Sequence, residues 1–166
     1  MDKSSSSSPT YSERYADVTI SSSDGVLFKL HRKNLEVYSE GFPGTDVPVH
    51  GEVVALTEKA STLELLFQYM YRERQPDLGK VHLDELALLA EAAEKYLVYS
   101  AMGVCKVHMQ LAISVMPLKV LGYAAKHSYE SLCVDAAQLT IDAKAVDALQ
   151  HMDLICFAKW ASAFAG

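Results

Sequence analysis

Residues 17–30, DVTISSSDGVLFKL, contain two short segments of alternating polarity separated by a turn. Polar and apolar residues alternate from Asp17 to Ser21, which predicts a half-buried strand. The turn ends in Gly25, which is free to take the positive φ that a tight turn needs. The returning segment predicts a second strand with three side chains on one face: Val26, Phe28 and Leu30. The stretch therefore predicts a β-hairpin.

The residues after the hairpin predict one short helix and one further strand. Leu35 and Tyr38 lie three residues apart within 31–39, a spacing that is typical of a helix. Glycine and proline interrupt residues 41–51 and predict an irregular connection. Residues 52–56, EVVAL, are apolar enough for a third strand. Because helices follow the strands, the expected class is α+β, a small three-stranded sheet covered by helices.

The rest of the chain predicts a series of amphipathic helices. Ser61 and Glu64 have the spacing of a capping box, in which each side chain satisfies a free amide at the start of a helix. Behind them, apolar residues recur every three or four positions: Leu63, Leu66, Phe67, Met70 and Tyr71. Similar stripes follow in the next two segments: Leu86, Leu89, Ala90, Ala93 and Leu97, then Met102, Cys105, Met109, Ala112 and Ile113.

The C-terminal third continues the helical pattern. Pro117 suits the first position of a helix, where its missing amide proton costs nothing. Further helices are predicted at these ranges: 118–127, 129–139, 143–151 and 154–163.

Composition narrows the classes of function. The chain has 166 residues, 50% of them hydrophobic, which suffices for a compact domain and argues against intrinsic disorder. Its 15 basic and 21 acidic residues give a net charge of −6, a poor match for the phosphate backbone of a nucleic acid. No nucleic-acid partner is therefore expected.

The cysteines and the apolar segments indicate the cellular compartment in which the protein is expected. Cys105, Cys133 and Cys156 are an odd and widely spaced set, which favours free thiols in a reducing compartment. The opening MDKSSSSSPT lacks the apolar region of a signal peptide. The longest apolar run, 111–125, is interrupted by polar residues and proline, so no membrane partner is expected. These features predict a protein of the cytoplasm or nucleus.

An ordered set of short motifs resembles the BTB (POZ) domain. Its members are Asp17-Val-Thr-Ile, Asp24-Gly25, Phe28-Lys-Leu-His31-Arg32, Val53-Val-Ala-Leu56, LELLFQYMY at 63–71 and LAEAAEKY at 89–96. The resemblance covers residues 15–116 and is greatest to the fungal BTB proteins. Residues 1–14 are then a flexible Ser-rich tail. Residues 117–166 resemble the helical extension that often follows such domains.

The resemblance implies a non-catalytic protein–protein interaction module. BTB domains form homodimers or heteromeric contacts, some bridge substrates to a cullin of a ubiquitin ligase, and others recruit transcriptional corepressors. By resemblance, Asp17 and Arg32 match a pair that lines a charged pocket in many dimeric members, and His31 adjoins them as a third interaction candidate. The expected partners are proteins: a second copy, a related BTB chain, a cullin or a corepressor.

Catalytic and metal sites have weaker support in the sequence. Cys105 and His108 could share a metal, but a structural zinc normally needs four ligands and no second pair is present. His31 has no motif that would make it a catalytic base, so a hydrogen bond to the backbone is expected. Glu91 and Glu94 are predicted to lie on the solvated face of their helix. We expect no catalytic residue, cofactor or metal; the alternative from another class is a small α+β enzyme with an unrecognised site.

Trp160 and Phe164 lie four residues apart near the C-terminus and share one edge of the last predicted helix. Exposed aromatic side chains contribute strongly to binding, so this pair is a candidate interaction patch. The favoured interpretation is that the helix docks on the core, because a single domain buries most of its aromatic residues.

Overall fold

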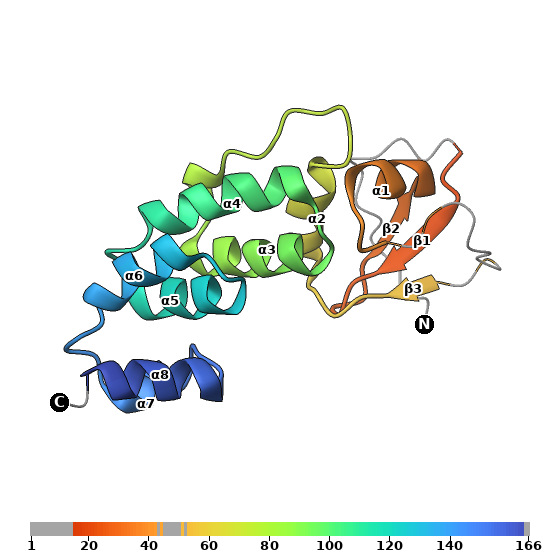
Figure 1. Cartoon of the computed structure of the whole chain (residues 1–166). Coiled ribbons are helices and arrows are strands. Elements are labelled where there is room, and N and C mark those ends of the chain that lie inside the picture. Colours follow the sequence, from red (N-terminus) through yellow and green to blue (C-terminus); the bar gives the residue numbers. More distant parts are fainter. Residues whose placement is uncertain (1–14, 43, 45–50, 52, 165–166) are drawn as a thin grey trace.

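A computed structural model describes these residues of the chain, without the side chain of Phe164 (Figure 1): 15–42, 44, 51 and 53–164. The described residues form a three-stranded sheet and a larger set of helices, which confirms the predicted α+β class. The predicted tail at 1–14 and most of the predicted connection at 41–51 lie outside them. None of the described helices is both long enough and apolar enough to cross a membrane.

The predicted hairpin and third strand form a mixed sheet in the order β2–β1–β3. β1 (Val18–Ser21) and β2 (Leu27–Leu30) pair antiparallel, whereas β3 (Val53–Ala55) pairs parallel to β1. Gly25 takes a φ of +86° in the hairpin turn, as predicted. Ile20 lies at the centre of the sheet and is fully buried, because alternate side chains of the hairpin face the helices.

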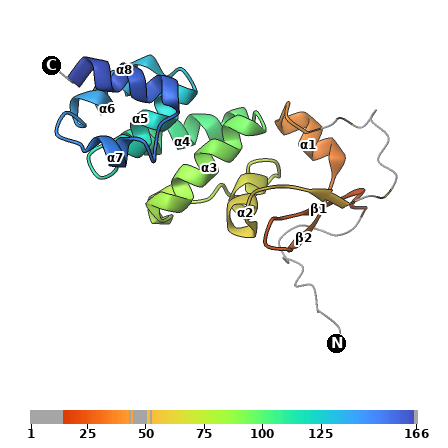
Figure 2. The same cartoon turned by 90° about the horizontal axis from the view of Figure 1, so that it is seen from below.

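The first helices cover the sheet and then one another. They are α1 (Arg32–Tyr38), α2 (Ala60–Gln68), the 3-10 turn η1 (Leu78–Lys80), α3 (Leu83–Lys95) and α4 (Tyr99–Leu111). The stripe predicted on α2 is buried against the hairpin, with the ring centroids of Phe28 and Phe67 5.3 Å apart. α2 packs on α3, and α3 packs on α4, so these helices separate the sheet from the C-terminal part of the chain (Figure 2).

The predicted capping box at the start of α2 is wrong. The helix begins at Ala60, whose amide donates a hydrogen bond of 2.8 Å to Asp24 Oδ1 in the hairpin turn. The Ser61 hydroxyl donates instead to Glu85 on α3. The hairpin turn packs beside the start of α2, so a distant carboxylate satisfies the helix end that Ser61 and Glu64 were expected to satisfy.

The C-terminal helices confirm the predicted series. They are α5 (Pro117–Lys126), α6 (Glu130–Gln138), α7 (Ala145–Ala148) and α8 (Leu154–Phe164). α5 packs against α3, α6 and α8, and its buried residues belong to the same core as those of α3 and α4. Gly122 on α5 lies against the backbone of His151, where a Cβ would be only 1.8 Å from the carbonyl oxygen. The missing side chain at Gly122 lets the connection between α7 and α8 pack directly on α5.

All three cysteines are free thiols, as predicted. Cys105 is fully buried on α4, and burial raises the pKa of its thiol to about 12. Cys133 and Cys156 are partly buried, and burial also raises the pKa of each. A thiol with a raised pKa is protonated at neutral pH and is a poor nucleophile.

Candidate functional site

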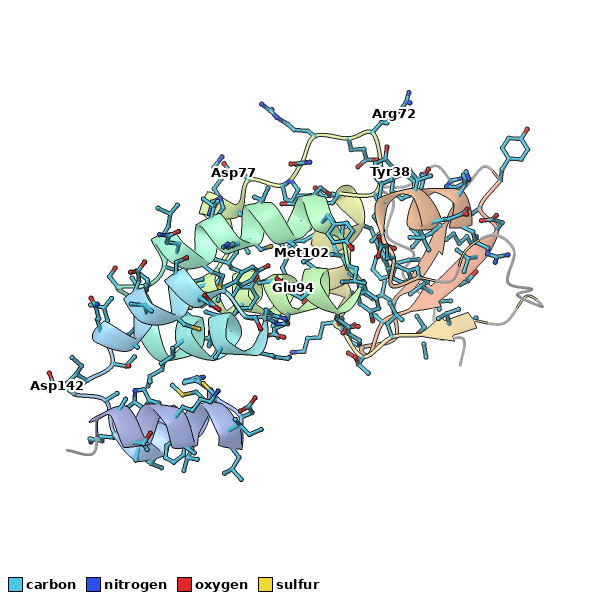
Figure 3. All side chains as sticks on the ribbon, in the orientation of Figure 1. Tyr38, Arg72, Asp77, Glu94, Met102 and Asp142 are labelled. Atoms are coloured by element: carbon cyan, nitrogen blue, oxygen red, sulfur yellow. The ribbon has the colours of Figure 1, made fainter. Side chains whose placement is uncertain are left out.

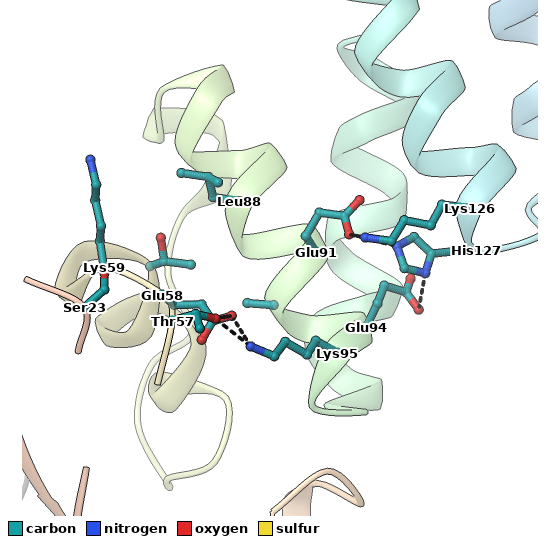
Figure 4. Close-up of a pocket in the computed structure, with 12 residues that line it drawn as sticks. Ser23, Thr57, Glu58, Lys59, Leu88, Glu91, Glu94, Lys95, Lys126 and His127 are labelled. Carbon is teal, nitrogen blue, oxygen red and sulfur yellow. Dashed lines mark hydrogen bonds and ion pairs between the residues drawn. The ribbon is translucent and has the colours of Figure 1, made fainter. Parts of the chain in front are cut away.

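A groove of about 720 Å³ opens between α3, the start of α2 and the end of α5 (Figure 4). Its polar lining comes chiefly from six side chains: Glu58, Glu91, Glu94, Lys95, Lys126 and His127. The groove therefore gathers acidic and basic groups from three parts of the chain that are far apart in sequence.

Glu94 does not lie on a solvated face, and this sequence prediction is wrong. Its side chain is only 9% exposed, because α5 and α6 pack over it (Figure 3). Its Oε1 accepts hydrogen bonds from the hydroxyls of Tyr123 at 2.8 Å and Tyr129 at 2.5 Å. Burial and the bonds to Glu94 raise the pKa of both phenols, that of Tyr129 to about 12. Both tyrosines therefore remain donors at neutral pH.

Glu91 lies about one turn earlier on α3, at the edge of the same cluster. Its side chain is 36% exposed, in partial agreement with the predicted solvated face, and it pairs with Lys126. Its Oε2 also lies 3.2 Å from His127 Nε2, while His127 Nδ1 lies 3.8 Å from Glu94 Oε2. His127, to which the sequence assigns no role, thus lies between two carboxylates.

The opposite wall of the groove holds a second cluster. Glu58 Oε1 lies 2.7 Å from Lys95 Nζ, and its Oε2 accepts a bond of 2.6 Å from the Tyr96 hydroxyl. Burial would raise the pKa of Glu58, but the hydrogen bonds from Lys95 and Tyr96 outweigh it and lower the pKa overall. Burial and the bond to Glu58 raise the pKa of Tyr96 to about 12. This cluster joins the segment after β3 to the end of α3.

We expect Glu58 to make the stability depend on pH on the acid side. Its folded pKa is lowered, so its contribution is present above the ordinary value of 4.5 and is lost as the pH falls through the folded value. Urea denaturation between about pH 5 and 3 should therefore show a shallower fall in the free energy of unfolding for Glu58→Gln than for wild type. Asp142→Asn, at an exposed position, should keep the wild-type slope. Equal slopes for Glu58→Gln and wild type would contradict the role of this cluster.

Apart from Lys59, the charged groups of the groove have partners within the described part of the chain. Glu58 pairs with Lys95, Glu91 pairs with Lys126, and Glu94 accepts from the two tyrosines. The arrangement fastens α5 and α6 onto α3, and the segment after β3 onto the end of α3. Among the residues that the structure describes, no three His, Cys, Asp or Glu side chains are placed to hold a metal ion.

The structure brings together the three interaction candidates of the hairpin. Asp17 Oδ1 accepts a bond of 2.7 Å from the backbone amide of Arg32, whose side chain donates to the carbonyl of Gly44. The His31 amide donates to the Tyr71 hydroxyl at 3.0 Å, and His31 Nδ1 lies 3.1 Å from the same oxygen. Asp17 and Arg32 thus meet through a side chain and a backbone amide at the start of α1.

Trp160 lies inside the C-terminal helices. It is 9% exposed, and its Nε1 donates a bond of 2.9 Å to the Thr140 hydroxyl. This agrees with the favoured interpretation of a docked helix and places Trp160 beneath the surface. The side chain of Phe164 lies outside the described residues.

A group of exposed apolar side chains lies on α1 and α4. Val37, Tyr38 and Tyr99 are exposed and line one shallow hollow where α1 meets α4, together with the carboxylates of Glu36 and Glu40. Val107 and Leu111 continue the exposed apolar residues along α4. The buried stripe that the sequence predicts on α4 does not include these residues. The signal was present, since Val107 and Leu111 lie four apart between the members of that stripe.

Comparison with known proteins leaves the family open. No protein-family model matches the sequence, and a search of curated proteins finds no match.

Proposed function

We propose that this chain is a non-catalytic protein–protein interaction module with a BTB (POZ)-like architecture, and that it self-associates through an exposed apolar surface. One observation carries the proposal, the exposed apolar side chains on α1 and α4: Val37, Tyr38, Tyr99, Val107 and Leu111. Large exposed apolar patches on a folded domain mark sites where another protein binds, because leaving them in water is unfavourable.

The element order supports the BTB-like part of the proposal. A hairpin, a short helix, a third strand and a set of helices follow one another at the spacings that the motif resemblance implies. Asp17 and Arg32 also lie together at the base of the hairpin. The resemblance places the same two residues in an interaction pocket.

The groove supports a structural role for its polar residues. An enzyme needs groups that are free to act on a substrate, whereas these carboxylates, lysines and phenols bond to one another. Their hydrogen bonds connect α3 to α5, to the start of α6 and to the segment after β3.

Solution molar mass tests the proposal directly. Light scattering over a dilution series from about 100 to 1 µM should give a mass near twice 18.3 kDa at the upper end. Added salt should not dissociate the complex, because the surface is apolar and ion pairs contribute little to it. A mass of 18.3 kDa at every concentration would contradict self-association.

A further inference from the structure

We draw no further inference here: the strongest candidate, the mainly apolar groove of about 490 Å³ between α5, α6 and α8, carries nothing because nothing in the structure shows what covers it, and its two charged lining residues, Glu130 and Lys159, are of opposite sign.

Discussion

Replacing Glu94 with alanine is expected to lower the free energy of unfolding by about 3 to 5 kcal/mol. The carboxylate is the shared acceptor of the Tyr123 and Tyr129 hydroxyls, at 2.8 and 2.5 Å. Without it, two hydroxyls beneath α5 and α6 lose a charged acceptor, and a small cavity replaces the side chain. Urea denaturation with circular dichroism measures the loss.

Two further variants test whether the loss of stability comes from the burial of Glu94 and its bonds to the two tyrosines. Glu91→Ala removes a carboxylate that is 36% exposed, so we expect a loss of less than about 1 kcal/mol. Tyr123→Phe should recover part of the stability in the Glu94→Ala background, because it removes one of the unpaired hydroxyls. Equal losses for Glu94→Ala and Glu91→Ala would mean that the buried cluster does not hold α5 and α6 on α3.

Replacing Gly122 with alanine is expected to release α7 and α8 from α5. The added Cβ would lie 1.8 Å from the carbonyl oxygen of His151 and 2.9 Å from its carbonyl carbon. Backbone atoms cannot move aside as the end of a flexible side chain can, so the connection between α7 and α8 must shift. The expected cost is about 3 kcal/mol, even though alanine has the higher helix propensity.

Trp160 reports this release because it is the single tryptophan of the chain. Its emission should shift to longer wavelength in Gly122→Ala, and acrylamide should quench it more strongly as α8 leaves its site. Gly103→Ala is the matched control, since its added Cβ meets open space and Trp160 emission should stay at the wild-type value. Wild-type emission and stability in Gly122→Ala would contradict the observed packing of α5 on His151.

Local sequence patterns were sufficient to predict the elements of the fold. Alternation in residues 17–30 predicted the hairpin and which of its side chains are buried, because successive residues of a strand point to opposite faces. Pro117 marked the start of α5, since its fixed φ suits the first helical position. Both effects act within a few residues and so are visible in one stretch of sequence.

The buried cluster was only partly visible in the sequence. Glu94 stands beside the apolar stripe of its helix, and a carboxylate there is typical of a solvated face. The C-terminal helices held an unused signal, because Tyr123, His127 and Tyr129 are polar groups within an apolar segment. Such groups need partners when they are buried. The partner itself could not be predicted without knowing that α5 packs on α3.

The sequence by itself determined the α+β class, the hairpin, the order of the helices and their buried stripes, because each depends on periodicity within one segment. Only the tertiary structure decided that Asp24 caps a helix 36 residues later. It also decided that Glu94 accepts from tyrosines 29 and 35 residues away, and that Val107 and Leu111 on α4 stay exposed. Periodicity shows which face of a segment is apolar. Which residues contact that face depends on how whole helices and strands pack together.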